Sequence, residues 1–175
     1  MIENLYEQCV LNNKNNKGVV FFALSAISVI CFAIALFCLV VGLRTDLLMI
    51  LYGIPFVIPA FILWRKKDEA YSEYEYCFIS GKIDIDKVIN NKRRKTVVSF
   101  ETSDLEVLGS VKSANFNRYY SMPDVKKIKA YFDLTEAETY FTLLSTKKGK
   151  VLLLFQPDET MLLSMKKYLK VRIEK

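Results

Sequence analysis

The sequence predicts a membrane helical hairpin followed by a mainly β domain of the α+β class that ends in one helix. Long uncharged apolar runs lie near the N-terminus, and short runs of alternating apolar and polar residues follow them. Near the C-terminus the apolar spacing becomes helical. We therefore expect an amphipathic N-terminal segment (1–17), a transmembrane part (18–64) and a cytosolic domain (65–175).

The two apolar runs are long enough to cross a bilayer. Gly18–Leu43 contains 26 residues without a charge, and Leu47–Trp64 contains 18. As helices they would be ~39 and ~27 Å long, against a hydrocarbon core of ~30 Å. A secretory signal peptide has a shorter apolar region and a cleavage site. The sequence therefore predicts two retained transmembrane helices, at about 18–43 and 47–64.

Basic residues flank the outer ends of this hairpin, whereas its loop holds one arginine and one aspartate: Lys14 and Lys17 before it, Arg65, Lys66 and Lys67 after it, Arg44 and Asp46 within the loop. Cytoplasmic flanks are enriched in Lys and Arg. The sequence therefore predicts a multi-pass protein of the cell membrane with both termini in the cytoplasm.

The N-terminal segment has the apolar spacing of one helix face, at Ile2, Leu5, Tyr6, Cys9 and Val10. Such a helix next to a membrane lies in the interface or packs on the protein. Two nearby acidic residues, Glu3 and Glu7, argue against attraction to anionic lipid. We therefore expect this helix to pack on the hairpin.

The cytosolic domain begins with four short alternating runs that are separated by turn residues: Tyr74–Ile79, Ile83–Ile89, Thr96–Glu101 and Leu105–Leu108. Short strands with tight turns predict an antiparallel meander. Residues 109–123 are polar and aromatic, and we expect a loop that folds over the strands. Three further strands follow, at 128–132, 139–145 and 151–155.

A helix is predicted after Pro157-Asp158-Glu159, because proline and acidic residues favour a helix start. Its apolar stripe consists of Met161, Leu162, Met165 and Leu169. Seven antiparallel strands, four and then three, closed by one C-terminal helix, describe a pleckstrin-homology-like (PH-like) barrel.

The order of these elements is similar to that of PH-like domains. Four segments resemble an uncharacterised family of small bacterial membrane proteins with an N-terminal two-helix hairpin and a PH-like cytosolic domain: Tyr74-Glu75-Tyr76, Gly81–Lys87, Arg93-Arg94-Lys95 and Phe155–Leu162. That family has no established activity. The resemblance therefore implies a layout and a compartment, and no catalytic residues.

Two basic runs are candidate contacts for an anionic lipid surface or a partner: Arg65, Lys66 and Lys67, and Lys92, Arg93, Arg94 and Lys95. The second run could instead bind an acidic protein or nucleic acid, or be a solvated turn that discourages edge aggregation. The first hairpin of the domain offers only Lys82, which argues against specific inositide binding. An aromatic loop around Arg118 is better explained by packing than by base stacking, so nucleic acid is disfavoured as a partner.

No catalytic or metal site is predicted. Asp84 and Asp86 project from one strand face and could hold Mg²⁺, but a solvated face that pairs with Arg93 or Lys95 explains them better. The chain has no histidine, and its four cysteines form no ligand cluster, so we expect free thiols and no cofactor.

The sequence favours a non-catalytic, membrane-anchored interaction module that binds a protein partner or the anionic membrane surface. The excess charge of +6 lies entirely in residues 65–175, which suits an anionic surface but is also ordinary for a soluble domain. The alternative is a small homo-oligomeric membrane assembly protein whose cytosolic domain is regulatory. An enzyme that uses Asp84 and Asp86 is the third hypothesis.

Overall fold

The structure, a computed structural model, describes residues 5–12, 16–134, 137–146, 149–168 and 173–174. It divides into two compact units. One unit, residues 13–72, holds the apolar helices, and the other combines residues 1–12 with residues 73–175 into the β domain. The domain is therefore built from both sides of the hairpin, which is a feature that the sequence did not reveal.

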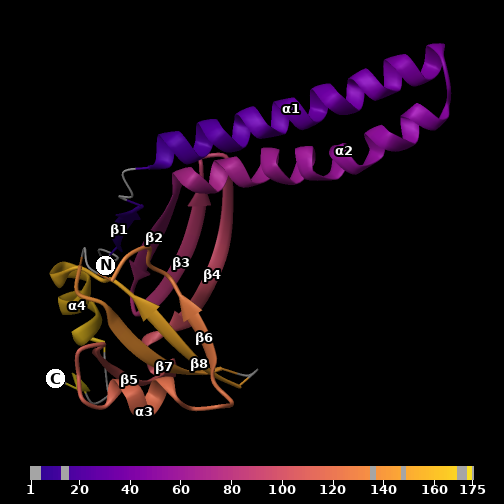
Figure 1. Ribbon diagram of the computed structural model, residues 1–175. Coiled ribbons are helices and arrows are strands. Elements are labelled where there is room, and N and C mark those ends of the chain that lie inside the picture. The colour runs from indigo at the N-terminus through magenta and orange to yellow at the C-terminus, as the bar shows by residue number, and fades with distance from the viewer. Residues whose placement is uncertain (1–4, 13–15, 135–136, 147–148, 169–172, 175) are drawn as a thin grey trace. The chain divides into compact units, whose positions relative to one another are not determined.

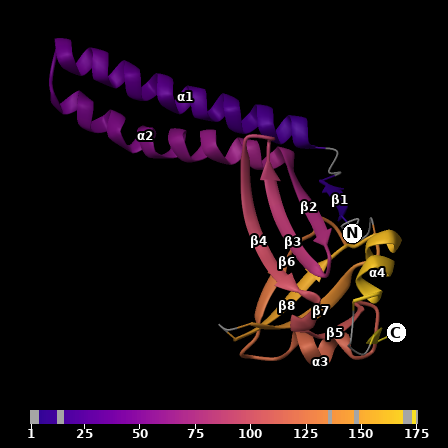
Figure 2. The ribbon, with the colours of Figure 1, turned by 180° about the vertical axis from the view of Figure 1, so that it is seen from behind.

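The hairpin consists of α1 (Lys17–Arg44) and α2 (Leu48–Lys66), which lie side by side in both views (Figures 1 and 2). A 3-10 turn, η1 (Lys67–Tyr71), follows α2. In the connecting turn, Asp46 accepts a hydrogen bond from the Leu48 N–H at 3.0 Å. The helices predicted for both apolar runs are thus present, with nearly the expected ends.

Small residues hold the two helices together. The buried residues of α1 and α2 are Ser28, Gly42, Gly53 and Ala60. The Ser28 Oγ donates to the Ala60 carbonyl oxygen at 2.8 Å. Only 11% of the residues in each apolar stretch are buried, so neither helix is the core of the β domain. Both helices are long and apolar enough to cross a membrane.

The first sheet of the domain has the order β1-β2-β3-β4. Its strands are β1 (Leu5–Leu11), β2 (Ser72–Ile79), β3 (Lys82–Ile89) and β4 (Arg93–Glu101). Residues with positive φ form the turns after β2 and β3, at Ser80-Gly81 and Asn90-Asn91. These turns are the ones that the sequence predicted, because Gly and Asn tolerate this conformation best.

The helix predicted for the N-terminal segment is wrong, because residues 5–11 form β1. This strand pairs antiparallel with β2, from Leu5 opposite Ile79 to Leu11 opposite Glu73. Its exposure alternates along its whole length, so period two describes it and period 3.6 does not. Ile2, which contributed to the helical spacing, lies outside the described residues.

The second sheet has the order β6-β8-β7-β5-β9. It contains β5 (Leu105–Ser110), β6 (Lys126–Lys129), β7 (Tyr140–Thr146), β8 (Gly149–Phe155) and β9 (Ile173–Glu174). β5 and β8 run antiparallel to β7, whereas β6 is parallel to β8 and β9 is parallel to β5.

Two details of the predicted barrel differ. The strand β5 belongs to the second sheet, because the 3-10 turn η2 (Thr102–Asp104) separates it from β4. This turn is fixed by a capping box between Glu101 and Asp104. The first sheet therefore contains β1 in place of the strand predicted at Leu105–Leu108. The strands that the structure describes form two sheets and no closed barrel.

Helices complete the domain at two places. The predicted loop contains α3 (Phe116–Tyr120), whose Phe116 and Tyr119 rings each lie 5.4 Å from the Phe141 ring on the second sheet. Helix α4 (Glu159–Lys166) begins where predicted, with Asp158 as its N-cap. Met161 and Met165 of α4 are fully buried in the core; Leu169 lies outside the described residues.

Candidate membrane-surface site

The basic run Lys92–Lys95 lies at the turn between β3 and β4, as predicted. Asn90 and Asn91 both have φ near +50°, and the Lys92 N–H donates to the Ile89 carbonyl oxygen at 3.1 Å. All four basic residues of the run are exposed. A tight two-residue turn thus presents a dense positive charge to solvent.

Arg94 differs from its neighbours, because it folds back onto the outer face of the first sheet. Its guanidinium lies 2.5 Å from Glu75 and 3.7 Å from Asp86. The sequence suggested Arg93 or Lys95 as partners for the strand carboxylates, and the structure adds Arg94 as a partner of Asp86. Lys92, Arg93 and Lys95 are exposed and remain candidates for surface contact.

The position of this turn in the sheet follows from the strand register. β1 ends at Leu11, opposite Glu73 near the start of β2. β2 and β3 are joined by the tight turn at Ser80-Gly81, so β3 ends where β2 begins. The basic turn therefore lies at the sheet end from which the chain leaves for α1 and to which it returns from α2.

The other basic run, Arg65–Lys67, belongs to the hairpin unit. Arg65 and Lys66 are exposed, and the Arg65 guanidinium lies 5.7 Å from the Phe61 ring centre. Lys67 is only 9% exposed. Its ammonium lies 3.1 Å from the Trp64 ring centre and 5.2 Å from that of Phe21.

This aromatic enclosure gives Lys67 a different place from the one that the sequence suggested. The ammonium is attracted to the faces of the aromatic rings and is shielded by them. Lys67 therefore drops out of the candidate surface contacts, and Arg65 and Lys66 remain.

The outer face of the first sheet carries an acidic trough. A shallow cavity of about 380 Å³ is lined by Glu7, Gln8, Cys9, Glu75, Tyr76, Cys77, Asp84, Asp86 and Arg94. Sequence reasoning found Asp84 and Asp86 but missed the side chains of β1 and β2, because cross-strand neighbours depend on the register. In the parts of the chain that the structure describes, no three acidic or cysteine residues are arranged to hold a metal ion.

Opposing effects set the ionisation of this trough. Burial disfavours the charge of Asp84, but the Ser99 hydroxyl and the Lys82 ammonium outweigh it and hold the pKa of Asp84 below its usual range. The Lys82 ammonium lies 3.1 Å from the Asp84 carboxylate. Burial and Glu73 raise the pKa of Cys9 to about 11, so its thiol stays protonated. These groups are poor nucleophiles and bases at neutral pH.

Comparison with known proteins matches nearly the whole chain to one family. No curated protein and no solved structure matches it. The family described as Bacterial PH-like domain (DUF6106) matches residues 3–175, so the match includes β1, the hairpin and the rest of the β domain. The chain, with its apolar two-helix hairpin and its mainly β domain, therefore belongs to this bacterial PH-like family.

Proposed function

We propose that the protein is a non-catalytic, membrane-anchored PH-like interaction module that holds its basic turn against the anionic cytoplasmic surface of the membrane. The observation that carries this proposal is the place of Lys92, Arg93 and Lys95. They lie at the sheet end from which the chain enters and leaves the hairpin. Membership of a PH-like family supports an interaction role, because such domains are generally not catalytic.

The pairing of β1 with β2 supports a hairpin whose two ends lie on the same side of the membrane. β1 precedes α1 and β2 follows α2, yet the two strands are hydrogen-bonded neighbours. A chain that crossed the membrane only once could not form this pair. The basic flanks, among them Arg65 and Lys66, favour the cytoplasm for both ends.

Electrostatics would hold the turn at the surface. Each Lys or Arg near an anionic leaflet contributes about 1 kcal/mol, and this attraction falls off over a Debye length of about 8 Å at physiological salt. Only five residues separate Leu11 from the first residue of α1, so the six steps between them span about 20 Å when extended. The tether is therefore short enough for the turn to reach the headgroups.

The same turn suits an acidic protein surface, which is the second candidate partner.

Homo-oligomer formation through the hairpin is the alternative function. The small residues that favour helix association, Ser28, Gly42, Gly53 and Ala60, are already used between α1 and α2. We therefore rank the surface module above the assembly protein.

A soluble form of the domain tests the proposal. Because Leu11 lies opposite Glu73, a short glycine-containing turn can replace the hairpin and join residues 5–12 to residues 72–175. This protein should sediment with vesicles rich in phosphatidylglycerol and not with phosphatidylcholine vesicles, and rising salt should release it. Replacing Lys92, Arg93 and Lys95 by Ser should weaken binding by about 100-fold, at about 1 kcal/mol for each charge.

A matched variant controls for net charge. Lys126, Lys127 and Lys129 are exposed on β6 of the second sheet, and replacing all three by Ser removes the same charge elsewhere. This variant should keep most of the vesicle binding. Equal losses in both variants would show non-specific attraction by net charge, and binding by neither variant nor parent would favour an acidic protein partner.

A further inference from the structure

Every second side chain of β1 points toward the core of the domain. Tyr6, Gln8 and Val10 are half-buried toward the core, whereas the residues between them are exposed. Tyr6 and Val10 pack against the core cluster. Gln8 is polar and lies between them, so its amide needs hydrogen-bond partners on the inner side.

The partners of Gln8 lie at the end of β8. Its Nε2 donates to the Gln156 carbonyl oxygen at 2.9 Å, and its Oε1 accepts from the Asp158 N–H at 2.8 Å. Pro157, between them, has no N–H and ends the regular pairing of β8. The side-chain amide of Gln8 thus takes the place that a backbone peptide group of a neighbouring strand would occupy.

Tyr6 makes the second contact at this place. Its hydroxyl donates to Asp158 Oδ2, while Asp158 Oδ1 accepts from the Met161 N–H at 2.8 Å and caps α4. The hydrogen bond to Asp158, together with burial, raises the pKa of Tyr6, so the hydroxyl remains a donor. One carboxylate therefore joins β1 to the first turn of α4.

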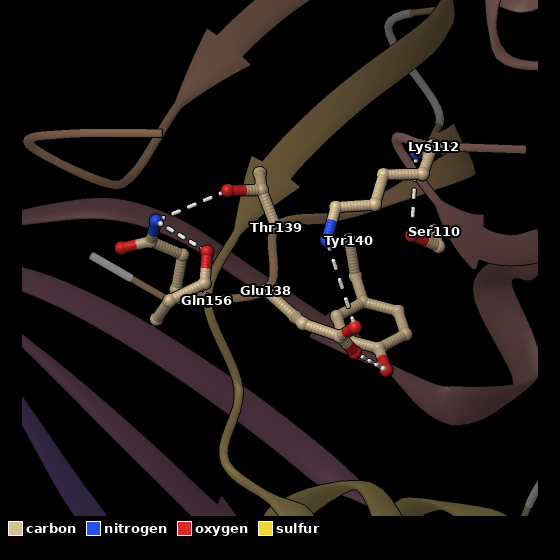
Figure 3. Close-up of polar contacts among 7 residues, drawn as sticks. Ser110, Lys112, Glu138, Thr139, Tyr140 and Gln156 are labelled. Atoms are coloured by element: carbon tan, nitrogen blue, oxygen red, sulfur yellow. Dashed lines mark hydrogen bonds and ion pairs between the residues drawn. The ribbon is translucent and has the colours of Figure 1, made fainter. Parts of the chain in front are cut away.

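Residues outside β1 hold Gln156, the acceptor of the Gln8 hydrogen bond, in place. Gln156 is buried, and its Nε2 donates to the Asp133 carbonyl oxygen at 2.6 Å. The same Nε2 donates to the Thr139 Oγ1 at 3.0 Å (Figure 3). Its N–H donates to the Tyr76 hydroxyl at 3.2 Å. None of these bonds involves β1, so they fix the carbonyl of Gln156 whether or not β1 is present.

We infer that the edge of β2, with Gln156 and Asp158, is a strand-docking slot, a site that binds one β-strand and recognises its Tyr6 and Gln8 side chains. Residues 5–11 of the same chain occupy this slot, and we call this segment the latch. A slip by one residue would turn Tyr6 and Gln8 outward, so the slot also fixes the register. The latch closes only in a chain whose hairpin returns to the side from which it started. This inference goes beyond surface binding and does not depend on it.

Hydrogen exchange on the full-length protein in detergent micelles tests the latch. The double substitution Tyr6→Phe and Gln8→Ala removes three hydrogen bonds to residues 156–158. Amide exchange should rise at least about tenfold in peptides from β1, β2 and the first turn of α4. Exchange in β7 and β8 should stay unchanged.

Outward positions on the same strand supply the control. Glu7→Ala and Leu11→Ala change exposed side chains of β1 and should leave exchange as in the parent protein. Unchanged exchange in the Tyr6 and Gln8 variant would overturn the side-chain readout. An equal rise throughout β7 and β8 would show that β1 is part of one cooperative core and not a latch.

A crosslink identifies the occupant. Leu11 lies directly opposite Glu73, so Leu11→Cys with Glu73→Cys in a background with the four native cysteines replaced by Ala provides a facing thiol pair. A short bismaleimide should link the pair within one chain, which agrees with docking by the same molecule. Crosslinked dimers would show that a second copy supplies the strand and would overturn the assignment.

Discussion

At the scale of single residues, the environment of Cys9 is the feature with a direct chemical consequence. Burial first, and then the Glu73 carboxylate 3.4 Å from its Sγ, raise the pKa of Cys9 from about 9 to about 11. Only the thiolate reacts with alkylating agents. The raised pKa thus leaves only a small fraction of Cys9 as the reactive thiolate.

We predict that iodoacetamide modifies Cys9 at pH 8 about 100-fold more slowly than an unperturbed thiol, because a raised pKa leaves a correspondingly smaller fraction of the thiol ionised at that pH. Site-resolved mass spectrometry of the full chain measures the rate. Glu73→Gln should accelerate the reaction, since it removes a nearby negative charge. A parent rate equal to that of a free thiol would contradict the predicted protection.

The sequence predicted the basic runs of the site, but not which side chain contacts each of their residues. Lys92–Lys95 were found because a charge run beside Asn90-Asn91 is visible in the sequence. Which member folds back onto Glu75, and which lysine is enclosed by Trp64, depends on atoms brought together by the fold. Sequence spacing contains no signal for the pairing of Arg94 with Glu75, whereas Trp64 and Lys67 are three residues apart, a spacing at which helical side chains can meet.

At the scale of elements, α1 and α2 were predicted from their continuous apolarity, and β2 to β4 from an alternation that is uninterrupted, whereas α3 lies in a segment predicted as a loop. β1 was not predicted as a strand, because the polar Gln8 occupies an inward position and hides the period-two pattern. Its amide is hydrogen-bonded to Gln156 and Asp158, which are 148 and 150 residues away in the chain. A tertiary contact therefore decided between helix and strand.

The close approach of α1 and α2 gives a prediction at this scale. A Cβ on Gly53 would lie 3.0 Å from the Cys38 Cβ and 3.2 Å from the Ala35 carbonyl oxygen. Gly53→Leu should therefore separate the helices and destabilise the hairpin by about 1–3 kcal/mol. Unfolding of the full chain in a detergent titration measures this.

The neighbouring exposed position provides the reference for that measurement. Ile54 is 52% exposed, so Ile54→Leu should leave the stability almost unchanged. Equal stability of the Gly53→Leu and Ile54→Leu proteins would show that the two helices do not pack through Gly53.

At the scale of the whole molecule, the hairpin interrupts the first sheet between its first and second strands. The pairing of β1 with β2 therefore requires the two ends of the hairpin to lie close together. The fold class and the bacterial PH-like family were predictable from element order and sequence segments. The shared sheet was not, because it joins segments that are 61 residues apart.

Topology reporters give the corresponding prediction. A periplasmic-type reporter inserted at Thr45, in the hairpin turn, should be active, whereas the same reporter after Lys175 should be silent. The reason is that the strand pair requires both hairpin ends on one side, and the basic flanks favour the cytoplasm. The reverse pattern would place the domain outside the cytoplasm and remove the basis for contact with the anionic inner leaflet.

The distance between the basic turn and the bilayer is the quantity that tests the proposed function most directly. A fluorophore on Lys92→Cys, in a full-length chain with its four native cysteines replaced, can be compared with one on Lys127→Cys in β6. Quenchers attached to lipid headgroups in nanodiscs should quench residue 92 more strongly than residue 127 in anionic bilayers, and high salt should reduce the difference. Equal quenching at both positions, or weaker quenching at residue 92, would contradict the membrane-surface role.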